Sequence, residues 1–188
     1  MNAALLPRYT PAAVTLHWIL AALIIFNLGF GLYTVGLPLS PQKLRLFSYH
    51  KWVGITVLIL SAARLLWRVT HPAPPLPDSM KPWEKRLANA SHTLLYALFF
   101  AAPITGWLFS SATGFQTVYL GVLPIPDLLQ KNKELADVLR LTHRWINYTM
   151  AAVIVLHVAA ALKHHFLDRD DVLTRMLPLR PQRTTSKE

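Results

Sequence analysis

Four long apolar segments separated by short polar connections constrain this chain more than any other feature of its sequence. The first lies in a stretch from Tyr9 to Gln42 that contains no Asp, Glu, Lys or Arg. An α-helix needs about 20 predominantly apolar residues to cross a hydrocarbon core about 30 Å thick. The pattern predicts four membrane-spanning helices, at about residues 13–35, 49–69, 88–110 and 143–163.

The composition agrees with a membrane protein. Of the 188 residues, 53% are hydrophobic and only 15% are charged, whereas about 25% of an average soluble domain is charged. We therefore expect an all-α integral membrane four-helix bundle in which residues 1–188 form a single domain. The formal net charge of +10 is explained by cationic loops at the membrane surface, so no nucleic-acid partner is expected.

Lysine and arginine near the span ends predict the orientation, because cytoplasmic loops carry an excess of these residues. With the N-terminus inside, the cytoplasmic side holds 12 of them: Arg8, Arg64, Arg68, Lys81, Lys85, Arg86, Lys163, Arg169, Arg175, Arg180, Arg183 and Lys187. The outer side holds seven: Lys43, Arg45, Lys51, Lys131, Lys133, Arg140 and Arg144. Both termini are therefore expected in the cytoplasm.

Histidines in the expected spans carry the clearest functional signal, since ionisable residues inside a membrane are rare and usually functional. His143 and His157 are 14 residues apart on the fourth helix. That spacing is about 3.9 turns and about 21 Å of rise, so the two face nearly the same direction at different depths. The expected topology puts His50 at the outer level with His143, and His17 at the inner level with His157.

Two facing histidine pairs at two depths match the axial ligands of two six-coordinate haems. The chain has no cysteine, which excludes covalent haem attachment through a C-x-x-C-H motif and leaves non-covalent haem b. A single histidine could equally be a hydrogen-bonded core residue, so the inference depends on the pairing. His92, at the start of the third helix, competes for the inner site, but its expected depth is too shallow.

Cations beside the histidines are candidates for binding the anionic haem propionates. Lys51 and Arg144 directly follow His50 and His143 on the outer side. Arg8, Arg64 and Arg68 are the candidates on the inner side. The same residues could instead mark the level of the lipid headgroups.

Several motifs resemble those of the prokaryotic cytochrome b561 family, a group of four-helix di-haem membrane cytochromes. They are Leu16-His17-Trp18, His50-Lys51-Trp52-Val53-Gly54, Arg64-Leu65-Leu66-Trp67-Arg68, Gly106-Trp107-Leu108 and the segment 161–171 with His164, His165 and three Asp. The resemblance covers nearly the whole chain. It implies axial ligation by His17 with His157 and by His50 with His143. It also implies electron exchange with ubiquinone in a respiratory chain of the bacterial inner membrane.

The resemblance further implies a quinone site just after the fourth helix. In one branch of the family, which oxidises superoxide at the outer face, a histidine at the quinone site matches His164. His165 is the second candidate, and both could instead anchor the chain at the membrane surface. Lys51 and Arg144 depart from that branch and look more like a branch paired with a small periplasmic lipid- or quinone-binding protein.

Three functions remain open on the sequence. The leading one is a quinone-linked oxidoreductase with a periplasmic-side donor, for which superoxide is a candidate because it would be steered by Lys43, Arg45, Lys51, Arg140 and Arg144. The alternative is an electron-relay haem anchor subunit that docks a redox partner through the loop over residues 113–140. A proton-coupled transporter without haem is disfavoured, because the expected spans contain no acidic residue.

Overall fold

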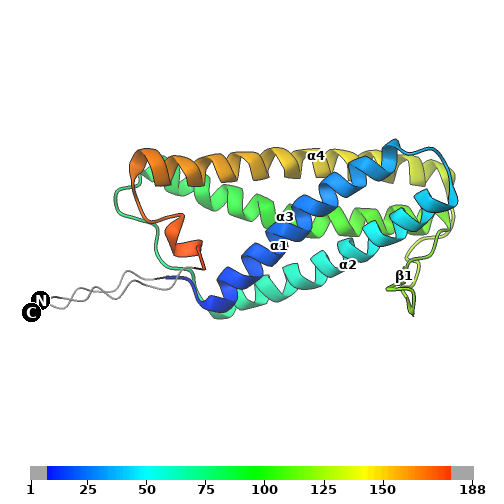
Figure 1. Cartoon of the computed structure of the whole chain (residues 1–188), viewed down its shortest axis with the longest axis horizontal. Helices are drawn as coiled ribbons and strands as arrows, with labels where there is room; N and C mark the ends of the chain where they lie inside the picture. The colour runs from blue at the N-terminus through cyan, green and yellow to red at the C-terminus, as the bar shows by residue number, and fades with distance from the viewer. Residues whose placement is uncertain (1–7, 179–188) are drawn as a thin grey trace, which may run out of the picture.

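Four long helices lie side by side along the long axis of the molecule (Figure 1). This computed structural model describes residues 8–178. The helices are α1 (Pro11–Gly36), α2 (Pro41–Thr70), α3 (Pro82–Thr113) and α4 (Lys133–Lys163). Each is long and apolar enough to cross a membrane. The expectation of an all-α, four-span bundle is met by the described residues. The three cations Arg180, Arg183 and Lys187 used in the orientation argument lie outside them.

Polar caps start three of the helices earlier than the apolar segments begin. Ser40 Oγ accepts a hydrogen bond from Lys43 N at 3.2 Å, and Asn132 Oδ1 accepts one from Leu135 N at 3.0 Å. Side-chain oxygens at this position satisfy amide groups that have no partner inside the helix. As a result α2 begins at Pro41 rather than near residue 49, and α4 at Lys133 rather than near residue 143.

The third helix is also longer than expected at its N-terminal end. Glu84 Oε2 accepts from Lys81 N at 3.0 Å, and α3 begins at Pro82 rather than near residue 88. Hydropathy marks only the apolar part of a helix, so the predicted starts are late, while the predicted ends agree with the structure within three residues. The long loop expected over residues 113–140 is confined to residues 114–132.

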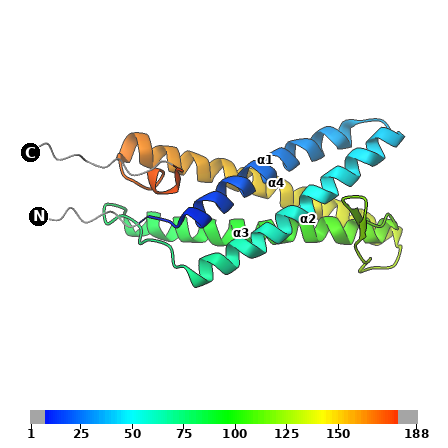
Figure 2. The same cartoon turned by 60° about the horizontal axis from the view of Figure 1, so that its bottom comes forward.

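The helices pack as two antiparallel pairs. α1 packs along α2, α3 packs along α4, and α2 joins the pairs through α3. Figure 2 shows α1 and α2 lying at an angle across α3 and α4. The buried core is small, because most apolar side chains of a membrane bundle face lipid. It comprises Leu20, Ile24, Val57, Leu98, Ala102 and Met150. Met150 is seven residues from each histidine of α4, so this core lies between the two histidine levels.

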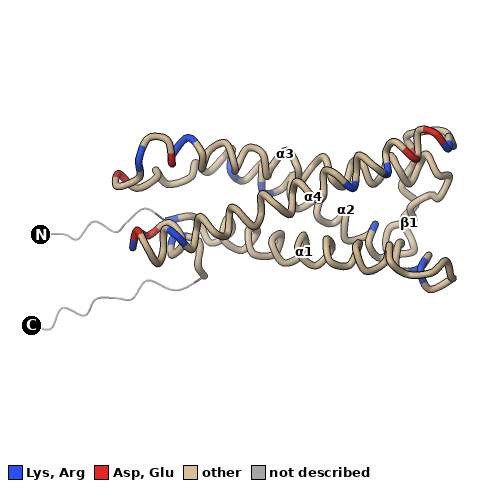
Figure 3. Tube along the Cα trace, turned by 90° about the horizontal axis from the view of Figure 1, so that it is seen from above, with Lys and Arg blue, Asp and Glu red and all other residues tan. Residues whose placement is uncertain are grey.

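The two ends of the bundle differ. At the termini end, where α1 begins and α4 ends, a π-helical turn η1 (His164–Asp168) and a 3₁₀ turn η2 (Thr174–Met176) fold back under the helices. Trp18 Nε1 donates to the Met176 carbonyl at 2.7 Å, which ties this segment to α1. In Figure 3 the described acidic residues lie only near the two ends, while some Lys and Arg lie further in along the helices.

The opposite end, the hairpin end, carries a small antiparallel pair, β1 (Val118–Tyr119) and β2 (Leu123–Pro124). Its turn has positive φ angles at Leu120 (52°) and Gly121 (76°). Trp52 Nε1 on α2 donates to the Val118 carbonyl at 2.7 Å. The hairpin is therefore held against the side of α2.

Candidate functional site

The structure brings the four histidines together as two pairs. His17 on α1 faces His157 on α4, with ring centres 6.3 Å apart. His50 on α2 faces His143 on α4, with ring centres 6.4 Å apart. The pairing expected from depth is therefore reproduced in space. The shared helix α4 puts one pair toward each end of the bundle.

Both separations suit a metal ion placed between two imidazoles. A metal–imidazole nitrogen bond is about 2.0 Å, and that nitrogen lies about 1.1 Å from the ring centre, so the ring centres of two opposed ligands are about 6.2 Å apart. Aromatic rings in direct edge-to-face contact lie about 4.5–7 Å apart, so the distance alone does not require a metal. Both histidine pairs have a separation that a shared metal between them would fit.

Two glycines leave room beside the rings of the hairpin-end pair. A Cβ added to Gly31 on α1 would lie 2.9 Å from His50 Cε1, and one added to Gly106 on α3 would lie 3.1 Å from His143 Cε1. These distances are shorter than ordinary van der Waals contact, so a larger residue would displace the imidazole. The helix backbones of α1 and α3 therefore form the walls against which these two rings lie.

Hydrogen bonds assign the free nitrogen of His143. Its Nδ1 lies 3.0 Å from the Ala102 carbonyl oxygen and 3.2 Å from Thr105 Oγ1. A carbonyl oxygen only accepts, so Nδ1 carries the hydrogen and Nε2 keeps its lone pair for a metal. A histidine metal ligand usually donates its second N–H in this way. His50 differs, because its buried Nδ1 has no partner among the described residues.

His92 is the one histidine whose place the sequence reasoning got wrong. Its ring lies at the level of His157, with ring centres 5.4 Å apart, so it is not too shallow. The misplacement follows from the early start of α3, which puts His92 ten residues inside the helix. The shorter separation is that of direct ring contact rather than of two ligands across a metal. His17 thus remains the partner of His157, with His92 beside them.

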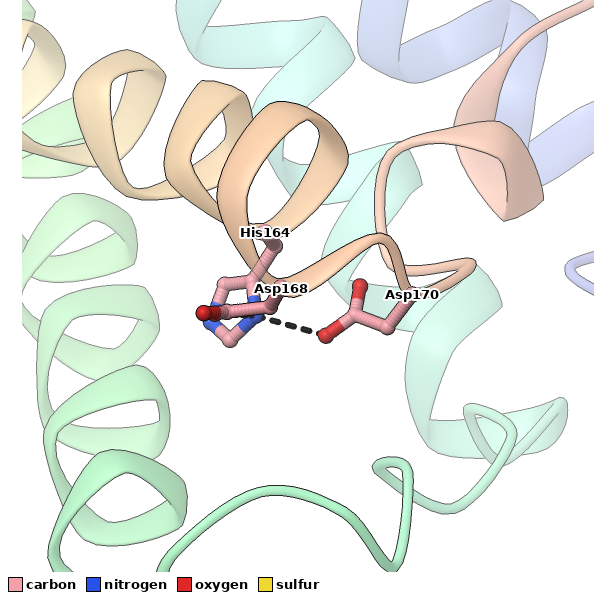
Figure 4. A group of neighbouring side chains, drawn as sticks. All are labelled: His164, Asp168 and Asp170. Atoms are coloured by element: carbon pink, nitrogen blue, oxygen red, sulfur yellow. Dashed lines mark hydrogen bonds and ion pairs between the residues drawn. The ribbon is translucent and has the colours of Figure 1, made fainter.

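His164 and His165 lie just past α4, in η1. His164 is buried, and its Nδ1 lies 2.7 Å from Asp170 Oδ2 and 3.0 Å from Asp168 Oδ2 (Figure 4). His165 is only half-buried and packs against Phe166. A polar cavity of about 250 Å³ adjoins the group. It is lined by Ser79, Met80, Lys81, Glu84, Lys163, His164, Asp168 and Asp170.

Comparison with known proteins assigns this arrangement to a family. A family model described as prokaryotic cytochrome b561 matches residues 8–179. The chain belongs to the prokaryotic cytochrome b561 family. It is similar to cytochrome b561 homolog 2 of Escherichia coli (strain K12), with 36% identity over 172 residues, 90% of this chain and 91% of the relative. It is also similar to the probable superoxide oxidase CybB of Yersinia pestis, with 31% identity over 181 residues, 91% of this chain and 96% of the relative.

Family membership makes this b561-type chain a haem-containing membrane electron-transport protein of a prokaryote. The residues present fit that cofactor. Two histidine pairs have the separation of axial ligands, and glycines stand against the rings of one pair. In that pair, His143 holds its hydrogen on Nδ1 and leaves Nε2 free, as an iron ligand requires.

The outer cations of this b561-type chain differ in their surroundings. The Lys51 ammonium donates to Ser110 Oγ at 3.1 Å and to the Phe115 carbonyl at 3.3 Å. It therefore ties α2 to the end of α3 and to the loop that follows. Arg144 is exposed. Their assignment to haem propionates stays a prediction.

Sequence reasoning missed three groups in the cytochrome's sites. Gly31 and Gly106 are identified only by their contacts with histidines on other helices. Asp170 is six residues beyond its partner His164, and the left-handed backbone of Arg169 (φ 54°) turns the chain so that they meet. The only advance signal for Asp170 was its place in the 161–171 motif.

Proposed function

We propose that this b561-family protein carries two b haems and passes electrons between a donor at the hairpin end and ubiquinone at the termini end. The inferred axial ligands are His17 with His157 and His50 with His143. The observation that supports this most is the near-equal ring separation of the two pairs, 6.3 and 6.4 Å, toward opposite ends of one bundle. When bound, a b haem supplies one-electron transfer at its iron.

The chain's own residues orient the ligands and separate the two sites. The Ala102 carbonyl fixes the tautomer of His143, and Gly31 and Gly106 set the position of the rings. The buried core around Leu20 and Met150 fills the space between the levels. We propose that all four helices form a single domain, because α1, α2 and α4 supply the ligands and α3 packs along α4 and holds His143 through Ala102.

The proposed orientation places the termini end in the cytoplasm of a bacterium, across its inner membrane. This orientation is supported by the Lys and Arg residues, which are more numerous at the termini end than at the hairpin end. On this orientation the hairpin end faces the periplasm.

A quinone site beside His164 is supported by the cavity at the termini end. Reducing a quinone to a quinol consumes two protons, so its site needs a proton-exchanging group with a path to water. His164 borders the cavity and is hydrogen-bonded to Asp170, while Asp168 on the other side is exposed. His165 lacks a comparable partner in the described structure, so we assign the role to His164.

Superoxide is the proposed donor at the hairpin end. The relative from Yersinia pestis is named a probable superoxide oxidase. A small anion would be steered to this end by its cations, of which Arg45, Arg140 and Arg144 are exposed. Superoxide-driven reduction of a water-soluble ubiquinone by the purified protein should exceed the uncatalysed rate. Equal rates with and without protein would exclude this donor.

An electron-relay subunit is the second candidate function. The observation that favours it is the hairpin, which exposes the large apolar side chains of Leu120, Val122 and Leu123. Such a surface suits a small periplasmic lipid- or quinone-binding protein. Electron transfer from that partner that depends on Val122, with no superoxide activity, would favour this role.

The first experiment counts haem in the detergent-purified protein. A pyridine haemochrome assay with a reduced-minus-oxidised spectrum should give two b haems per chain. His50→Ala and His17→Ala should each leave about one. His71→Ala is the control, because His71 is exposed and stacks on Trp67. Two haems in His50→Ala would overturn the ligand assignment.

A further inference from the structure

Arg64 is a fixed cation beside the histidines of the termini end. It lies inside α2 and is half-buried. Its Nε donates to Tyr96 Oη on α3, and its Nη1 donates to the Ala13 carbonyl on α1, both at 3.2 Å. Ala13 is one turn before His17, and Tyr96 is one turn after His92. The guanidinium is therefore held between α1 and α3 at the level of the His17–His157 pair.

The partners that hold Arg64 are neutral. Every ion pair within residues 8–178 uses another cation, and none joins a carboxylate to Arg64. Nη2 also makes no hydrogen bond within that range. Charged residues inside a membrane span are expensive and are usually paired or functional. A guanidinium held only by a hydroxyl and a carbonyl keeps its full charge, and that charge acts on its surroundings.

The charge of Arg64 is fixed at the level of one histidine pair by its bonds to Tyr96 and Ala13. Arg64 interacts electrostatically with His17, His92 and His157. At the level of His50 and His143, the guanidinium of Arg144 is exposed. Lys51, although next to His50 in sequence, points its ammonium to Ser110 and Phe115. The two sites thus differ by a fixed positive charge.

We propose that Arg64 makes the haem at His17 and His157 easier to reduce than the haem at His50 and His143, and so directs electrons toward the termini end. Reduction adds one electron and lowers the net charge of the site by one. A fixed cation nearby therefore stabilises the reduced state. The unpaired Nη2 can also donate to a haem propionate, with the same sign of effect. The inference rests on the two ligand pairs of the proposed function.

Potentiometric titration of the purified protein, followed in the visible spectrum, tests this role. His50→Ala, which should keep only the termini-end haem, assigns the two midpoints. Arg64→Gln should lower the midpoint potential of the termini-end haem by about 59 mV. For one electron this is a tenfold change in the ratio of oxidised to reduced haem at a fixed potential. The hairpin-end midpoint should not move. Arg64→Lys keeps the charge and should keep most of the midpoint.

Arg68→Gln is the matched control. Arg68 lies one turn away on the same helix and, like Arg64, is 6.0 Å from the centre of the Tyr96 ring. Arg68 makes no hydrogen bond within residues 8–178, whereas Arg64 is bonded to Ala13, one turn before His17. Arg68→Gln should change the ratio of oxidised to reduced termini-end haem, at a fixed potential, by less than threefold. A shift as large as that of Arg64→Gln would contradict a specific role for Arg64.

Two outcomes overturn the proposal outright. One is an unchanged termini-end midpoint in Arg64→Gln with both haems bound. If Arg64→Gln instead loses that haem, Arg64→Lys decides. If Arg64→Lys recovers both the haem and its midpoint, the role of charge is supported. If Arg64→Lys fails to recover either one, the proposal is overturned, because Arg64 then acts through its shape alone. A failure of the ligand pairs is seen separately, as two haems retained in His50→Ala.

Discussion

Gly31 on α1 lies against the imidazole of His50 on α2, so close that a Cβ would come within 2.9 Å of Cε1. A side chain at this position would collide with the imidazole. Because 2.9 Å is shorter than any ordinary carbon–carbon contact, the ring or the helix has to move. The position of a proposed ligand is thus set by the absence of a side chain on a neighbouring helix.

Replacing Gly31 by Ala is therefore expected to impair the hairpin-end haem specifically. Affinity for that haem should fall at least tenfold, as for other residues that position a metal ligand. Haem counting and low-temperature spectra should show about one haem per chain, with the termini-end signal unchanged. Gly29→Ala is the control, because a Cβ at Gly29 on the same helix meets nothing within 4 Å. Equal haem loss in both variants would show a general weakening of α1.

Asp170→Asn should slow quinone reduction without removing haem. The carboxylate accepts from His164 Nδ1 at 2.7 Å and keeps that ring oriented at the cavity. The asparagine amide is neutral, so its oxygen accepts a weaker hydrogen bond from His164, and the amide can rotate to present its NH2 group instead. The rate of quinone reduction should therefore fall about tenfold. Asp78→Asn is the control, since Asp78 pairs at 3.8 Å with Lys85 on the surface. Full quinone activity in Asp170→Asn would separate this pair from the quinone site.

Leu20→Ala should destabilise the bundle. Leu20 is 2% exposed in the core between the two histidine levels. Truncating a buried leucine typically lowers the free energy of unfolding by about 2–5 kcal/mol. Thermal unfolding in detergent, followed by release of haem, measures the change. Leu32→Ala on the same helix is 63% exposed and should change stability by less than about 0.5 kcal/mol.

Trp52→Phe should loosen the hairpin. It removes the indole N–H that donates to the Val118 carbonyl at 2.7 Å. One such hydrogen bond is worth about 1 kcal/mol, which corresponds to roughly fivefold faster protease cleavage between residues 115 and 128. Trp83→Phe is the control, because Trp83 is exposed and its indole makes no hydrogen bond in the described structure. Unchanged cleavage in Trp52→Phe would mean that other contacts hold the loop.

The four helices and the four paired histidines could be predicted because both signals are local or periodic. Hydropathy identifies a span without knowledge of its neighbours, and the 14-residue spacing on α4 fixes two depths on one face. Each membrane crossing reverses the direction of the chain, so the order of the helices decides whether a histidine on α1 or α2 lies at the level of His143 or of His157. The expectation for His17 with His157 and for His50 with His143 needed no tertiary detail.

The rest of the site depends on distances between helices, which no single segment encodes. Whether His92 reaches His157 is decided by where α3 begins and how it packs along α4. The contacts of Gly31 and Gly106 exist only after α1 and α3 have packed. Lys51 looked like a cation for the neighbouring site, yet its acceptors are Ser110 at the end of α3 and Phe115 in the loop that follows.

The buried core between the histidine levels has a consequence for energy conversion. Leu20, Ile24, Val57, Leu98 and Met150 carry no ionisable side chain and no hydroxyl or amide, so the side chains of this cluster offer no group to which a proton could bind. An electron that moved between the two levels would travel alone through about 21 Å of rise along α4. One charge crossing the full membrane against 100 mV corresponds to about 2.3 kcal/mol. Each such transfer would be electrogenic, because it would move one negative charge across an apolar layer of low dielectric constant.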